Sequence, residues 1–159
     1  MDNIISEEFI FLDINAKNKE DVISYMVERL LEKKIVKKEF YSKILEREAN
    51  YPTGLKCGDI NVAIPHADYK YVNKTAIAIG ILKEPVKFNR MDLEEEIDVS
   101  IVMILAISDP NKHIKLLQRI SELIQNQDIL AELINANSRQ KILNIFKNKL
   151  EEDVKWKHY

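Results

Sequence analysis

The chain has 159 residues and a mass of 18.6 kDa, which fits one domain with a substantial hydrophobic core. Its 24 Lys and Arg residues nearly balance 26 Asp and Glu residues, so the composition lacks the basic excess typical of nucleic-acid binding. The single cysteine cannot form an internal disulfide, and no apolar run reaches the ~20 residues of a membrane span. The N-terminus also lacks signal-peptide features. We therefore expect a soluble, cytoplasmic protein without direct membrane insertion.

The N-terminal third predicts one short strand followed by two helices. Phe9–Leu12 is apolar and predicts the strand. Apolar residues recur at helical spacing from Lys19 to about Lys34, with Asn18 as the N-cap. A second helix is predicted from about Lys38 to Ala49. Arg47 lies in its last turn, which directs this side chain toward the loop that follows.

That loop carries the turn Pro52-Thr53-Gly54 and leads to a short strand. Gly54 is expected to permit a positive φ, and the donors of Thr53 are expected to face an anion. Ile60–Ile64 predicts a strand that stops at the following proline, which has no N–H for the ladder. His66 therefore stands just past a strand end, at the carboxyl edge of a sheet, where α/β folds bind ligands.

The central third of the chain predicts the remaining strands. Thr75–Leu82 is strand-like, and Pro85–Phe88 predicts a short hairpin partner or edge strand. Ile97–Ile107 is the most apolar segment and predicts a central strand buried on both faces. It ends at Asp109-Pro110, a cap followed by proline at the first helical position, so His113 is expected in the first turn of a helix.

Three helices are predicted after this strand. The first begins at Pro110, the second runs from its cap Asp128 to about Asn135, and the third from its cap Ser138 to about Leu150. Residues 151–159 are predicted to form a loose tail, which leaves residues 1–150 as the domain. The order of elements predicts an α/β (α+β) single-domain sandwich, with a mixed four- to five-stranded β-sheet flanked by helices.

Two of the three histidines are expected at the same end of this sheet. His66 follows one strand, and His113 opens the helix after another, where unpaired N–H groups and the helix dipole favour anions. Arg47 adds a guanidinium fork, and Thr53 and Gly54 complete a phosphate-binding loop. One nucleophilic nitrogen surrounded by donors suits phosphoryl capture by imidazole, whereas acyl transfer would need a serine or cysteine nucleophile.

Each of these residues also has a plainer interpretation. His66 could be a surface histidine that hydrogen-bonds a carbonyl, His113 a solvated residue, and Arg47 a partner of its helix C-terminus or of neighbouring glutamates. His66-x-Asp68 has metal-ligand spacing, and His113 could be the third ligand of a metal hydrolase. No Cys/His cluster accompanies them, however, and we predict no metal site. Cys57 lies in a polar loop and is interpreted as incidental.

Several short motifs resemble the enzyme IIA proteins of the bacterial phosphotransferase system, in the fructose–mannitol superfamily. The resemblance covers about residues 5–150 and rests on Glu46-Arg47-Glu48, Pro52-Thr53-Gly54, Val62-Ala63-Ile64-Pro65-His66 and Lys112 to Leu117. Tyr51-Pro52-Thr53-Gly54-Leu55 is most similar to the galactitol-type branch. The family fold is an α/β sandwich around a mixed sheet, consistent with the order of elements above.

This resemblance implies a phosphotransferase in which His66 is the phosphoacceptor, with His113 and Arg47 as stabilisers of the phosphoryl group. Family members take phosphate from phospho-HPr and pass it to a cysteine of enzyme IIB, whose permease partner is enzyme IIC. No metal or organic cofactor is implied. The second hypothesis is a regulatory EIIA-like module that reports phosphorylation state by binding regulators or transporters.

Overall fold

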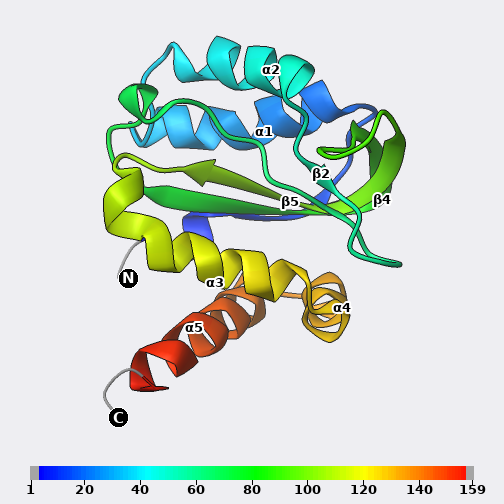
Figure 1. The fold of residues 1–159 in the computed structure, drawn as a ribbon, viewed down its shortest axis with the longest axis vertical. Coiled ribbons are helices and arrows are strands. Elements are labelled where there is room, and N and C mark those ends of the chain that lie inside the picture. The colour runs from blue at the N-terminus through cyan, green and yellow to red at the C-terminus, as the bar shows by residue number, and fades with distance from the viewer. Residues whose placement is uncertain (1–3, 157–159) are drawn as a thin grey trace.

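Two long strands form the centre of the sheet in the computed structural model, which describes residues 4–156 and the side chains of residues 4–150 (Figure 1). β4 (Ala76–Asn89) and β5 (Glu96–Ala106) pair antiparallel, from Ala76 opposite Ala106 to Asn89 opposite Glu96. The two predicted strands at 75–82 and 85–88 are therefore one strand. Its ladder is irregular between Ile81 and Val86, where Pro85 lacks the N–H that a regular ladder needs.

The shorter strands extend the sheet on both sides in the order β1-β4-β5-β3-β2. β1 (Ile10–Ile14) lies parallel to β4, and β3 (Val62–Ala63) lies parallel to β5. β2 (Gly54–Leu55) is antiparallel to β3. The prediction of a mixed sheet of four to five strands in an α/β sandwich is confirmed, although β2 was expected to be only a turn.

Helices cover both faces of this sheet (Figure 1). α1 (Lys19–Glu32) and α2 (Phe40–Asn50) lie on one face, and α3 (Ile114–Ile124), α4 (Gln127–Asn135) and α5 (Arg139–Trp156) lie on the other. Short 3-10 turns also occur at Glu7–Phe9 (η1), Tyr69–Tyr71 (η2) and Pro110–His113 (η3).

Strand alternation divides the hydrophobic core into two parts. In β5, Val102 and Ile104 pack with the α1–α2 layer, whereas Ile101 and Met103 pack with the α3–α5 layer. β5 is buried on both faces from Ile101 to Ala106 and is apolar at each of these positions, whereas Glu96 and Asp98 at its start are exposed. An unbroken apolar run of this kind predicts a central strand.

Side-chain caps fix the starts of α1 and α5 at the predicted positions. The Oδ1 of Asn18 accepts the backbone N–H of Asp21 at 2.8 Å, and the Oγ of Ser138 accepts that of Lys141 at 3.2 Å. The cap of α4 was predicted wrongly. Asn126, not Asp128, accepts the N–H groups of Asp128 and Ile129, at 3.0 and 3.2 Å.

Two helix boundaries also differ from the prediction. The segment after Asp109 begins as the 3-10 turn η3, so α3 starts at Ile114 rather than Pro110. α5 continues to Trp156, past the predicted end at about Leu150, so at least the first part of the expected loose tail is helical. Residues 157–159, which complete that tail, lie outside the described residues.

Candidate functional site

The end of β5 holds His66 at the edge of the sheet. The backbone N–H of Leu105 donates to the carbonyl of Pro65 at 3.1 Å, and His66 forms a parallel bridge with Leu105. Leu105 is the penultimate residue of β5, so the prediction that His66 stands at a strand end is confirmed. Attachment to a central strand restrains a segment that follows only two residues of regular β3.

One hydrogen bond defines the state of the His66 imidazole. Its Nδ1 lies 2.8 Å from the carbonyl oxygen of Ile64, and a carbonyl only accepts, so Nδ1 carries the proton and donates. In the neutral ring, Nε2 then keeps its lone pair. The bond to a carbonyl is the contact expected of a plain surface histidine, yet it also leaves the second nitrogen free to act as a nucleophile.

The surroundings of His66 favour this neutral ring. The side chain is half-buried, and this burial lowers its pKa below the usual 6.5. The hydrogen bond to Ile64 opposes the shift, while the positive charge of Arg47 adds to it. The net effect is an imidazole whose pKa is depressed, so that its nucleophilic form is present at neutral pH.

Arg47 lies in the last turn of α2, at the place predicted from the sequence. Its guanidinium is exposed and lies over the ring of Tyr51, 5.7 Å from the ring centroid. Arg47 and Tyr51 line a hollow of about 230 Å³ together with Ala67 and Asp68, which directly follow His66. The fold thus brings Arg47 to the same surface region as His66, where an exposed guanidinium can meet an incoming anion.

Thr53 and Gly54 have roles other than the predicted ones. The backbone N–H and the hydroxyl of Thr53 both donate to the carboxylate of Glu48, so neither donor is directed at an anion. Gly54 is not among the residues with positive φ. It is needed because a Cβ there would lie 2.6 Å from the carbonyl oxygen of Asn89. Both residues shape the loop from inside, and a phosphate-binding role for this loop stays a prediction.

His113 lies at the same end of β5 as His66 but is not joined to it. It is the last residue of η3, which follows β5 closely, and it directly precedes α3. Its side chain is half-buried. Among the described residues, no hydrogen bond or ion pair connects His113 to His66 or Arg47. Its part in the site therefore stays a prediction.

Glu48 is a buried residue of this region for which the sequence predicted no role in the site. It is 3% exposed and accepts hydrogen bonds at both oxygens, although both of its neighbours in the sequence, Arg47 and Ala49, are exposed. A signal was available, because Phe40, Ile44 and Glu48 are spaced by four and share one helix face. A carboxylate on the inward face of a helix needs hydrogen-bond partners, which makes such a position informative.

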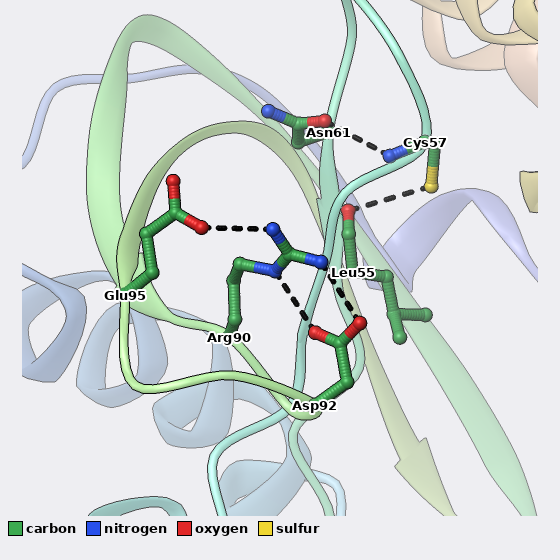
Figure 2. Close-up of polar contacts among 6 residues, drawn as sticks. All are labelled: Leu55, Cys57, Asn61, Arg90, Asp92 and Glu95. Carbon is green, nitrogen blue, oxygen red and sulfur yellow. Dashed lines mark hydrogen bonds and ion pairs between the residues drawn. The ribbon is translucent and has the colours of Figure 1, made fainter.

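The loop between β2 and β3 holds Cys57 in an unreactive setting. Its N–H donates to the side chain of Asn61 at 3.0 Å, and its thiol donates to the carbonyl of Leu55 at 3.4 Å (Figure 2). Burial raises the pKa of the thiol, which disfavours the nucleophilic thiolate.

Figure 2 also shows the guanidinium of Arg90 paired with the carboxylates of Asp92 and Glu95 in the β4–β5 turn.

The metal-hydrolase alternative finds no support in the geometry. Within residues 4–150, no group of three or more His, Cys, Asp or Glu side chains is arranged to hold a metal ion. Asp68, one of the three residues in that hypothesis, instead caps η2 by accepting the N–H of Lys70.

In the part of the chain that the structure describes, no helix is long and apolar enough to cross a membrane.

These features define a class of protein: a mixed α/β domain that presents a neutral, half-buried histidine beside an arginine at one edge of its sheet. The chain matches the family model described as "Phosphoenolpyruvate-dependent sugar phosphotransferase system, EIIA 2" over residues 3–149. It therefore belongs to this EIIA family, and membership implies phosphotransferase activity in general. The resemblance noted from the short motifs is confirmed.

Curated relatives carry several sugar specificities. The galactitol-specific EIIA component of Escherichia coli (strain K12) is 26% identical over 132 residues, 83% of this chain and 88% of that protein. The mannitol-specific EIICBA component of Pasteurella multocida is 29% identical over 91% of this chain, and the fructose-specific EIIABC component of Bacillus subtilis is 33% identical over 89%. The chain spans only 23% and 22% of the length of these two multidomain proteins.

Solved structures show the same fold. The enzyme IIA of the Escherichia coli mannitol complex with phosphorylated enzyme IIB has a TM-score of 0.75 at 24% identity, over 90% of this chain and 96% of that chain. The nitrogen regulatory protein IIA-Ntr of Neisseria meningitidis has a TM-score of 0.71 at 22% identity, over 89% and 95%. This chain thus shares its fold with a mannitol enzyme IIA and with a nitrogen regulatory protein.

Proposed function

We propose that this protein is a cytoplasmic phosphocarrier of a bacterial sugar phosphotransferase system, and that His66 carries the phosphoryl group at Nε2. The observation that carries the proposal is the 2.8 Å hydrogen bond from Nδ1 of His66 to the carbonyl of Ile64. It assigns the proton to one nitrogen and leaves the lone pair on the other. A half-buried ring with a depressed pKa keeps that lone pair available at neutral pH.

In the proposed reaction, Nε2 attacks the phosphorus of phospho-HPr in line. A new nitrogen–phosphorus bond forms while the bond to the donor breaks, so HPr leaves without its phosphoryl group. Arg47 supplies positive charge for the phosphoryl oxygens, and His113 acts as a second stabiliser of the group. Neither step calls for a metal or an organic cofactor, because imidazole is itself a sufficient nucleophile.

The proposed acceptor is the cysteine of an enzyme IIB, which serves an enzyme IIC permease. Similarity along 88% of the galactitol-specific EIIA component supports a galactitol-type system. The mannitol enzyme IIA seen in complex with phosphorylated enzyme IIB shares the fold, which supports docking of a IIB partner on this one. Exposure of Arg47 and Tyr51 beside the site fits a shallow surface that two different proteins reach in turn.

The test is intact-mass analysis after incubation with phosphoenolpyruvate, enzyme I and HPr. We expect one acid-labile phosphoryl adduct on the wild type, none on His66→Ala, and retention of the adduct on His113→Gln. An adduct that persists on His66→Ala would overturn the assignment of the phosphoacceptor.

The labelled protein is then offered purified galactitol, mannitol and fructose enzyme IIB domains. Transfer to the galactitol IIB cysteine alone is the expected result. Transfer only to another IIB would correct the sugar. A stable phosphohistidine that reaches none of the three would contradict the transport role and favour a regulatory module.

A further inference from the structure

The buried carboxylate of Glu48 lies one residue after Arg47 and faces the interior. Its Oε1 accepts the hydroxyl of Thr53 at 2.7 Å, and its Oε2 accepts the backbone N–H of the same residue at 2.9 Å. Thr53 is itself only 1% exposed. The two bonds fix both the side chain and the backbone of Thr53 against the end of α2.

From Thr53 the hydrogen bonds continue to the proposed phosphoacceptor. The carbonyl of Thr53 accepts the N–H of Ile64 at 3.3 Å, in register with the pairing of Gly54 and Ala63. The carbonyl of Ile64 in turn accepts Nδ1–H of His66 at 2.8 Å. Glu48 is thus connected to the imidazole through two residues, and each link is a hydrogen bond.

The segment after β3 is held to β5 through the bond from Leu105 to the carbonyl of Pro65, whereas Ile64 itself is held only by the short ladder between β2 and β3. Each strand has only two residues, so the bond between Thr53 and Ile64 lies at the last position of the pairing. Short ladders fray at their ends, where few neighbouring bonds restrain the backbone. By fixing Thr53, Glu48 stabilises the end of the ladder that leads to His66.

We propose that Glu48 is a positioning residue for His66: through Thr53 and Ile64 it holds the imidazole with the proton on Nδ1 and Nε2 free. The inference rests on the proposed function for the use made of Nε2, but the geometry it describes is independent of phosphorylation. If the Ile64 carbonyl moved away, the proton could occupy Nε2 instead, and that tautomer has no lone pair at the reacting atom.

Three variants separate positioning from plain stabilisation. Glu48→Ala removes both bonds to Thr53. Glu48→Gln keeps them, because the amide oxygen accepts the N–H while the amide nitrogen donates to the hydroxyl, which also accepts. Thr53→Val removes only the hydroxyl bond. Leu133→Ala is the matched control, since Leu133 is fully buried in the core on the opposite face of the sheet.

Two readouts are measured on each variant. The first is the His66 tautomer, from the ring ¹⁵N shifts at a pH where the ring is neutral. The second is the single-turnover rate of phosphoryl transfer from phospho-HPr at saturating donor. Displacement of a reacting atom by about 1 Å can cost on the order of 100-fold in rate. We expect a roughly 10- to 100-fold loss for Glu48→Ala, an intermediate loss for Thr53→Val and near wild-type rates for Glu48→Gln.

The ¹⁵N shifts should show the largest Nε2–H population in Glu48→Ala, a smaller one in Thr53→Val and a wild-type population in Glu48→Gln. Leu133→Ala should show no change. If Glu48→Ala fails to fold, the pair Glu48→Gln and Thr53→Val carries the test. An unchanged tautomer and rate in the folded variants would overturn the inference, while a wild-type adduct on His66 would still support the phosphocarrier. If wild type takes no phosphate, the proposed function fails, and the tautomer measurement still decides the role of Glu48.

Discussion

Gly54 is the position where the structure makes its sharpest prediction about packing. A Cβ at this residue would lie 2.6 Å from the carbonyl oxygen of Asn89 and 3.2 Å from its carbonyl carbon, whereas ordinary contacts begin near 3.4 Å. The atoms in the way belong to the backbone of β4 and cannot move by changing a rotamer. The carbonyl of Gly54 also accepts the N–H of Met91 at 2.8 Å, so β2 holds the β4–β5 turn at this point.

Gly54→Ala must therefore push the turn and β2 apart by about 0.8 Å or break that contact. Overpacking of this kind costs about 1–3 kcal/mol, and the stiffer unfolded chain of alanine offsets about 0.4–1 kcal/mol. We expect a net loss of about 1–2 kcal/mol in the free energy of unfolding. With a urea m-value of about 1–3 kcal/mol/M, the midpoint should fall by roughly 0.3–2 M.

Urea unfolding monitored by circular dichroism measures this loss, and hydrogen exchange at the Met91 amide reports where it arises. Gly80→Ala is the control, because its Cβ would meet only the side-chain ends of Ile14 and Met26, at 2.7 and 2.8 Å. These side chains can adjust, so we expect the smaller loss there. A Gly54→Ala protein as stable as wild type, with unchanged Met91 exchange, would refute the argument.

Three further predictions concern charge and capping. Arg47→Ala should raise the pKa of His66 toward 6.5 and move the acid limb of the phosphorylation rate to higher pH, while Arg47→Lys should not. NMR titration of the imidazole measures the pKa, and equal pKa values in the two variants would contradict the prediction. Because burial raises the pKa of Glu48 above 4.5, its ionisation costs the folded state stability as pH rises through the raised value. Glu48→Gln should then be more stable than wild type at pH 7 and lose that advantage below about pH 4.5. Urea midpoints of both proteins at pH 4 and pH 7 check this, and a difference in midpoint that does not change with pH would count against it. Asn126→Ala should lower the free energy of unfolding by about 1 kcal/mol, since it removes the cap of α4. Asp128→Ala should lower it by only about 0.3–1 kcal/mol, because Asp128 contributes only a charge in the first turn. Thermal unfolding compares the two variants, and a larger loss in Asp128→Ala would show that Asp128 is the cap.

Much of the fold was predictable because its signals are local. The period of apolar residues located α1 and α2, and the uninterrupted apolar run located β5. Asn18 and Ser138 were recognisable as caps because a cap depends on the first turn of its own helix. Even His66 at a strand end followed from the proline before it, which ends the ladder.

The errors arose where a residue's environment comes from distant parts of the chain. The proline at position 85 predicts a break between two strands, but β4 pairs with β5 on both sides of it. Gly54 was explained by its own φ, while the actual constraint is the backbone of Asn89, 35 residues away in the sequence. The donors of Thr53 were expected to face an anion, because the sequence near Thr53 does not show that both of them donate to Glu48.

The sequence by itself therefore determined the elements, the family and the candidate phosphoacceptor, because periodicity, caps and short motifs are local properties of the chain. Only the tertiary structure decided which nitrogen of His66 is free, since that depends on the carbonyl of Ile64 and on the register of β3 against its neighbours. The burial of Glu48 is likewise a property of the packed domain, because a carboxylate is drawn inside only where folding brings donors to both of its oxygens.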